Sequence, residues 1–180
     1  YTVPALSGAR KGGEAMAAWR DVAYPARKAD LYRMLNAQLA ALMEGEHDAL
    51  PNMANACALI YWALEDVNWA GFYLYRQGTL VLGPFQGKPA CIRIPLGRGV
   101  CGVAAQSRRT QLVANVHEFE GHIACDAESN SEIVIPLIRE GRLLGVLDLD
   151  SPLFSRFDEA DQAGLEALAK RLADGCDWPV

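Results

Sequence analysis

The chain has 180 residues, of which 51% are hydrophobic and 22% charged, and its formal net charge is −5. This length and composition are typical of one globular domain that folds around its own core. The negative charge and the lack of a basic stripe argue against a protein that binds nucleic acid or anionic membranes, because both require clustered lysine and arginine.

The sequence contains no apolar run long enough to span a bilayer, and Tyr1 to Gly13 lack the apolar core of a signal peptide. Five cysteines, an odd number, occur in a chain with enough apolar residues to fold without disulfides. This pattern favours reactive or buried thiols in a cytoplasmic protein. Because the chain starts with Tyr rather than Met, an upstream targeting segment stays an open alternative.

The first half of the chain is predicted to be helical after an irregular start. Residues 1–23 show weak periodicity and are expected to form an N-terminal extension, which leaves residues 24–180 as one domain. Apolar residues recur at steps of three and four from Leu31 to Met43, and again from Leu50 to Leu64 after Asp48. Two consecutive helices are therefore expected.

From Asn68 onward the pattern predicts strands, two of the pairs being hairpins: residues 69–75, 79–82, 92–94, 111–114, 133–139 and 143–150. A short helix is expected over 99–107 and a final helix from about Asp158. The strands do not alternate with helices, so the glycines at 97, 99 and 102 read as turn residues and not as a dinucleotide fingerprint. The predicted class is α+β, with a central antiparallel sheet flanked by N-terminal and C-terminal helices.

Three of the five cysteines lie in turn-rich segments where a thiol could react. Cys91, Cys101 and Cys125 occur in loops or at a loop–helix junction, although each could equally be a buried structural residue. Cys57 falls on the apolar face of the second helix and is interpreted as core, and Cys176 is expected to be frayed. The start of a helix would favour a thiolate or an anionic ligand at Cys101.

The loop from Asn115 to Asn130, which contains Cys125, is longer than a connection requires, and such loops are usually functional or disordered. His117 and His122 in this loop, together with the cysteines, supply residue types that bind zinc. Their spacing matches no zinc motif, so no metal site is expected.

Acidic residues gather at the end of the last hairpin. Asp148 and Asp150 point to the same face of their strand, and Glu132 begins the partner strand close to them. A solvated strand end is the common explanation, whereas three carboxyls at a pocket would bind an ammonium group or hold a proton. Trp69 and Tyr73 share a strand face, either in the core or against a ligand.

Several blocks of sequence together resemble the free methionine-(R)-sulfoxide reductases. They occur in the family's order between about Tyr24 and the last helix, namely residues 68–73, 82–87, 91–95, 99–102, 122–126, 129–136 and 145–151. The chain departs from the family pattern in its long N-terminal segment and in Cys57 and Cys176.

The resemblance implies a single GAF domain and assigns roles to matching positions. Cys125 matches the nucleophile that attacks the sulfoxide, Cys91 matches the resolving thiol, and Cys101 matches a third functional cysteine of open role. The substrate-binding positions fall on Glu132, Asp148, Asp150, Trp69 and Tyr73.

The implied reaction is the reduction of free L-methionine-(R)-sulfoxide to L-methionine. We expect a protonated carboxyl to protonate the departing oxygen, a sulfenic acid on Cys125 and then a disulfide with Cys91. Thioredoxin, supplied with electrons from NADPH, would regenerate the thiols, and no metal or organic cofactor is expected. The amphipathic first helix is compatible with a homodimer.

Two other functions fit the sequence less well. A non-catalytic GAF sensor of small molecules would usually be joined to an effector domain, and the chain lacks the signature of cyclic-nucleotide binders. A redox switch would react with peroxide without turning over a sulfoxide.

Overall fold

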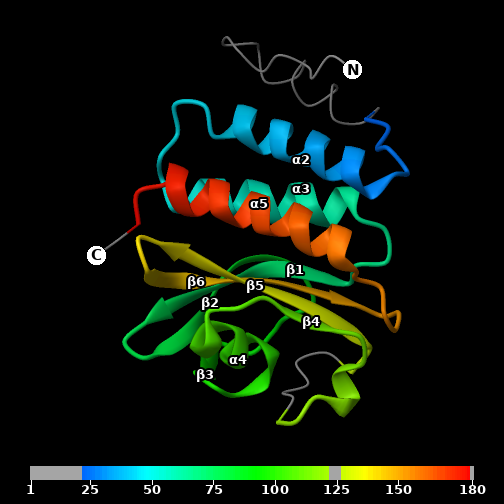
Figure 1. Ribbon diagram of the computed structural model, residues 1–180. Coiled ribbons are helices and arrows are strands. Elements are labelled where there is room, and N and C mark those ends of the chain that lie inside the picture. Colours follow the sequence, from blue (N-terminus) through cyan, green and yellow to red (C-terminus); the bar gives the residue numbers. More distant parts are fainter. Residues whose placement is uncertain (1–21, 122–126, 179–180) are drawn as a thin grey trace.

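The computed structural model describes residues 22–121 and 127–178 (Figure 1). Its elements are, in order, α2 (Lys28–Leu42), α3 (Ala49–Ala63), β1 (Trp69–Arg76), β2 (Thr79–Gly87), β3 (Arg93–Pro95), α4 (Gly99–Ser107), β4 (Gln111–Val113), the 3-10 helix η1 (Val116–Glu118), β5 (Ser131–Arg139), β6 (Arg142–Ser151) and α5 (Glu159–Gly175). Most of the proposed N-terminal extension lies outside the described residues, so that domain division stays a prediction. None of the described helices has the length and apolarity of a membrane span.

All six strands form one antiparallel sheet in the order β3-β2-β1-β6-β5-β4. Helices α3 and α5 cover one face and α2 packs on both of them, whereas α4 lies against the opposite face (Figure 1). The predicted α+β class, with a central antiparallel sheet flanked by helices from both ends of the chain, is confirmed.

Side chains alternate between the two faces of the sheet and build two cores. On β6, Leu147 and Leu149 point into the large core under the helices, so Asp148 between them points to the α4 side. On β1, Phe72 joins the helix-side core and Tyr73 joins the smaller core beneath α4. The period of two therefore fixes which side chains can meet beneath α4.

Strand β2 is longer than the sequence predicted, because it continues to Gly87. The prediction ended at Leu82, since Gly83 and Pro84 are residues that usually mark a turn. In the structure these two residues sit at a register shift opposite Phe72, between the pairs Gly71↔Phe85 and Tyr73↔Leu82. A bulge tolerates proline because the strand ladder is already interrupted there.

The prediction that Cys176 is frayed is wrong, because its side chain is only 1% exposed. The residues around it are held to the start of α3: Asp177 N donates to His47 O at 2.7 Å, and Asn52 Nδ2 lies 3.4 Å from the Cys176 sulfur. The prediction that Cys57 is buried in the core is confirmed.

A buried carboxylate fastens the start of α5 to α2. Asp161 accepts hydrogen bonds from Tyr32 Oη at 2.8 Å and from Lys28 Nζ, and it completes a capping box with Asp158. The side chain of Asp161 is 1% exposed, so water could hardly take its place as the acceptor for these donors. This contact links α2 to α5, which are far apart in the sequence.

Replacing Asp161 by Ala is expected to lower the free energy of unfolding by about 3 kcal/mol, because it leaves buried donors unpaired. Urea unfolding measures the loss. Asp174→Ala is the matched control: its pair with Lys170 is exposed, and its effect should stay within about 0.5 kcal/mol. Equal effects of the two substitutions would contradict this account of α5.

Candidate active site

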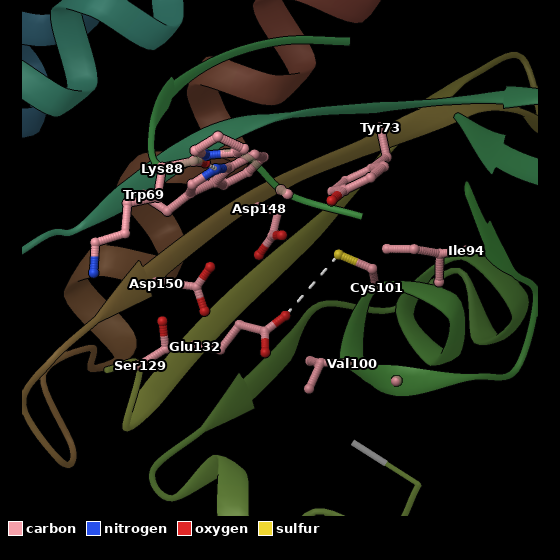
Figure 2. Close-up of a pocket in the computed structure, with 13 residues that line it drawn as sticks. Trp69, Tyr73, Lys88, Ile94, Val100, Cys101, Ser129, Glu132, Asp148 and Asp150 are labelled. Atoms are coloured by element: carbon pink, nitrogen blue, oxygen red, sulfur yellow. Dashed lines mark hydrogen bonds between the residues drawn. The ribbon is translucent and has the colours of Figure 1, made fainter. Parts of the chain in front are cut away.

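A pocket opens on the α4 side of the sheet, where β1, β5 and β6 meet the start of α4 (Figure 2). The space between its lining atoms is about 530 Å³, which includes open solvent at the mouth. The lining residues are Trp69, Tyr73, Lys88, Pro89, Ala90, Ile94, Gly99, Val100, Cys101, Ser129, Glu132, Asp148 and Asp150.

The acidic residues of the last hairpin converge in this pocket. Strand pairing places Glu132 opposite Asp150, with Asp148 one step along the same face of β6. Glu132 and Asp148 are each only 6% exposed. The alternative that these carboxyls lie in solvent at a strand end is therefore wrong for both residues. Asp150 is half-buried. A burial of two carboxyls side by side requires that at least one holds a proton or meets a cation.

Burial raises the pKa of both carboxyls of this pair. Desolvation raises the pKa of Glu132 well above its ordinary value, and the charges of Asp148 and Asp150 raise it further. Desolvation also raises the pKa of Asp148, to about 6. Because the negative charge of Asp148 itself raises the pKa of Glu132, Glu132 is the carboxyl of the pair that keeps its proton to higher pH, and it can serve as a proton donor next to an anion.

Cys101 lies against the same pair from the first turn of α4, with its sulfur 4.0 Å from Glu132 Oε1. Burial raises the pKa of the Cys101 thiol well above its ordinary value, and the charges of Asp148 and Glu132 raise it further. The expectation that the helix start favours a thiolate here is wrong, because burial among carboxyls outweighs a helix dipole of about half a charge.

An aromatic wall faces the acidic residues. The Trp69 ring stacks on Phe85 at 5.3 Å and on Tyr73 at 5.9 Å, and Trp69 Nε1 donates to Lys88 O at 3.1 Å. A Cβ atom on Gly71 would lie 2.4 Å from the Trp69 ring, so only glycine lets the indole lie flat on the strand. The predicted common face of Trp69 and Tyr73 is confirmed.

The two remaining cysteines have different positions. Cys91 is half-buried in the segment between β2 and β3, beside the pocket-lining residue Ala90, but is not itself among the described residues that line the pocket. Cys125, the predicted nucleophile, lies outside the described residues, as does His122. His117 is exposed and its ring contacts Asn130 Oδ1 at 2.8 Å.

Two polar residues of the pocket were not selected from the sequence. Ser129 is buried and accepts a hydrogen bond from Asn68 Nδ2 at 3.2 Å. Lys88, which borders the opening, pairs with Glu128 at 2.5 Å. Ser129 begins one of the sequence blocks that resemble the family, so the resemblance could have indicated it as a site residue. Nothing in the sequence distinguishes Lys88 from other lysines in loops.

The buried carboxyls make stability depend on pH. Between about pH 4 and pH 6 the unfolded chain has released the Asp148 proton while the folded protein retains it. The free energy of unfolding should therefore fall as pH rises through this window, by at most about 1.4 kcal/mol per pH unit for one proton. Asp148→Asn should make the fall shallower in denaturant titrations from pH 4 to 7, and identical slopes would contradict the assignment.

Similarity to known proteins shows which class of protein has this fold and pocket. A family profile described as GAF domain matches residues 52–175. The chain is 54% identical over 145 residues to the free methionine-R-sulfoxide reductase of Escherichia coli K12, covering 81% of this chain and 88% of that protein.

Solved structures agree with this class. The reduced form of fRMsr from Staphylococcus aureus has a TM-score of 0.79 at 50% identity, covering 81% of this chain and 95% of that one. The free methionine-R-sulfoxide reductase of Neisseria meningitidis, in complex with its substrate, has a TM-score of 0.82 at 44% identity, covering 86% and 93%. The chain therefore belongs to the free methionine-R-sulfoxide reductases of the GAF domain family, and it is an oxidoreductase.

Proposed function

We propose that this protein reduces free L-methionine-(R)-sulfoxide to L-methionine with electrons from its own thiols. The observation that supports this most strongly is the buried pair of Glu132 and Asp148 in a pocket that Trp69 and Tyr73 also line. The Escherichia coli relative bears the name of this activity, and the Neisseria meningitidis enzyme was crystallised with its substrate.

The two sides of the pocket suit the two ends of the substrate. Asp148 and Asp150 would hold the free ammonium group, since carboxylates in a partly buried site bind a cation more strongly than in water. Trp69 would pack against the methylthio end, where an aromatic ring offers apolar contact. An amino group joined in a peptide bond carries no charge, so the free amino acid should be preferred.

The reaction transfers one oxygen atom from the sulfur of the substrate to the sulfur of Cys125. The Cys125 thiolate attacks the sulfoxide sulfur while Glu132 protonates the sulfoxide oxygen, which is otherwise a poor leaving group. The sulfur of the substrate is reduced to the thioether of methionine, and Cys125 is oxidised to a sulfenic acid that keeps the oxygen. Asp148, ionised beside Glu132, would stabilise the ammonium group throughout.

Two further thiols complete the cycle. The Cys91 thiol condenses with the sulfenic acid, which forms a disulfide and releases water, and the dithiol of thioredoxin then reduces that disulfide. The Cys101 thiol stays protonated beside Glu132 and Asp148, so it would not add a second thiolate to the pocket. This scheme uses no metal or organic cofactor and suits a cytoplasmic enzyme, as a monomer or as a homodimer.

Turnover of free L-methionine-(R)-sulfoxide with thioredoxin, thioredoxin reductase and NADPH tests the proposal. NADPH consumption should be stoichiometric with the methionine formed, and N-acetylation of the substrate should lower kcat/KM by about a hundredfold or more, because it removes the charged partner of the carboxylates. A silent enzyme that still gains thermal stability from a small molecule would overturn the proposal in favour of a sensor.

A further inference from the structure

Three potential metal ligands converge where α4 meets β5 and β6. The ligand atoms of Cys101, Glu132 and Asp148 all lie within 4.8 Å of one another, and all three residues are buried. In a tetrahedral zinc site, bonds of about 2.3 Å to sulfur and about 2.1 Å to oxygen give a sulfur–oxygen separation of about 3.6 Å. The Cys101 sulfur is already 4.0 Å from Glu132 Oε1, so small rotations of these side chains would suffice for coordination.

A second observation points to a cation at the same place. Asp148 Oδ1 is buried and has no hydrogen-bond partner among the described residues, and its carboxyl group faces the pocket beside Cys101 (Figure 2). A buried carboxylate oxygen without a donor is costly, and a bound cation would compensate for it.

The charges around the pocket also favour a dication. Its lining contains three carboxyl groups and one thiol, whereas Lys88 is the single lysine or arginine in the described lining and is paired with Glu128. Acidic groups in a cleft attract cations, and two positive charges match such a site better than one. The thiol ligand selects zinc over magnesium or calcium, which prefer sites made of oxygen atoms.

We propose that Cys101, Glu132 and Asp148 bind one Zn²⁺ ion, with water at the fourth position, and that the ion excludes the substrate from the pocket. Zinc takes no part in the reaction and acts as a reversible inhibitor. The exclusion rests on the proposed function, because it assumes that Asp148 also receives the substrate's ammonium group. The binding of zinc itself does not depend on that function.

Metal titration of the reduced, metal-free enzyme tests the binding site. We expect one Zn²⁺ per chain by competition with a chromophoric chelator, and Cd²⁺ should produce an ultraviolet thiolate-to-metal charge-transfer band. Cys101→Ser should abolish the band and weaken Zn²⁺ binding at least about a hundredfold, whereas Cys57→Ser, a buried thiol outside the pocket, should preserve both. A band that survives in Cys101→Ser would place the ion on other thiols and overturn the proposal.

A measurement on the unaltered enzyme avoids the risk that a variant fails to fold. Zn²⁺ at about a hundred times its Kd should raise Tm by roughly 5–10 °C, and Mg²⁺ should not. Saturating L-methionine should raise the apparent Kd for Zn²⁺ at least tenfold, whereas N-acetyl-L-methionine should not. Absence of the Tm shift, or zinc binding unaffected by L-methionine, would overturn the proposal, while turnover in the presence of a chelator tests the reductase separately.

Discussion

Replacing Glu132 by Gln should lower kcat for reduction of free L-methionine-(R)-sulfoxide by about 10²–10⁴-fold, the usual contribution of a positioned general acid. Glutamine has the same shape and hydrogen-bonding reach as glutamic acid but no proton that it can give to the sulfoxide oxygen. Burial raises the pKa of Glu132 well above its ordinary value, which favours the protonated carboxyl that a general acid requires. The coupled NADPH assay measures the loss.

The pH profile separates a proton donor from a residue that only shapes the pocket. Wild-type kcat should fall as pH rises through the pKa of Glu132, and that alkaline limb should disappear in Glu132→Gln. Glu128→Gln is the matched control, because Glu128 is an exposed carboxyl outside the pocket lining, and its kcat should change less than about twofold. A loss below tenfold in Glu132→Gln, with the limb retained, would show that the proton comes from another group.

Replacing Cys125 by Ser should abolish turnover, with a loss of at least about 10⁴-fold, because a hydroxyl group is a poor nucleophile at neutral pH and cannot accept the oxygen as a sulfenic acid. Cys91→Ser should behave differently, since the first chemical step needs only Cys125. This variant should form one methionine per chain and then stop with thioredoxin as reductant.

Mass spectrometry of the stalled Cys91→Ser protein, after treatment with a reagent that traps sulfenic acids, should find the adduct on Cys125. Cys101→Ser completes the comparison: because the Cys101 thiol is buried and neutral, this variant should retain the first step. If Cys101→Ser, and not Cys125→Ser, loses the formation of methionine, the roles of the two thiols must be exchanged.

The strands and their faces could be predicted because periodicity is a local property of the sequence. On β6, the alternation of Asp148 and Asp150 with leucine predicted that both carboxyls lie on one face of the strand. On the neighbouring strand β1, the spacing of Trp69 and Tyr73 predicted that both rings share one face. The bounds of α4 were also predicted correctly, because its glycines precede a continuous run of small apolar residues. Such features depend only on neighbouring residues.

The environment of the site could not be predicted, because it depends on contacts between distant segments. The sequence left open whether the acidic strand end is solvated. In the structure Glu132 and Asp148 are buried, in a pocket that residues of α4 and of the loop before β3 also line. The same contact reverses the expected ionisation of Cys101, since the carboxyls that oppose a thiolate come from β5 and β6. The burial of Cys176 likewise depends on its contact with α3.

A single-turnover experiment without any external reductant tests most directly whether the protein's own thiols reduce the sulfoxide. Fully reduced enzyme is mixed with excess free L-methionine-(R)-sulfoxide, and both the methionine formed and the thiols remaining are counted. We expect one methionine per chain and the loss of two thiols, those of Cys91 and Cys125. Folded, fully reduced enzyme that forms no methionine, or forms it without losing thiols, would show that these thiols do not reduce the sulfoxide.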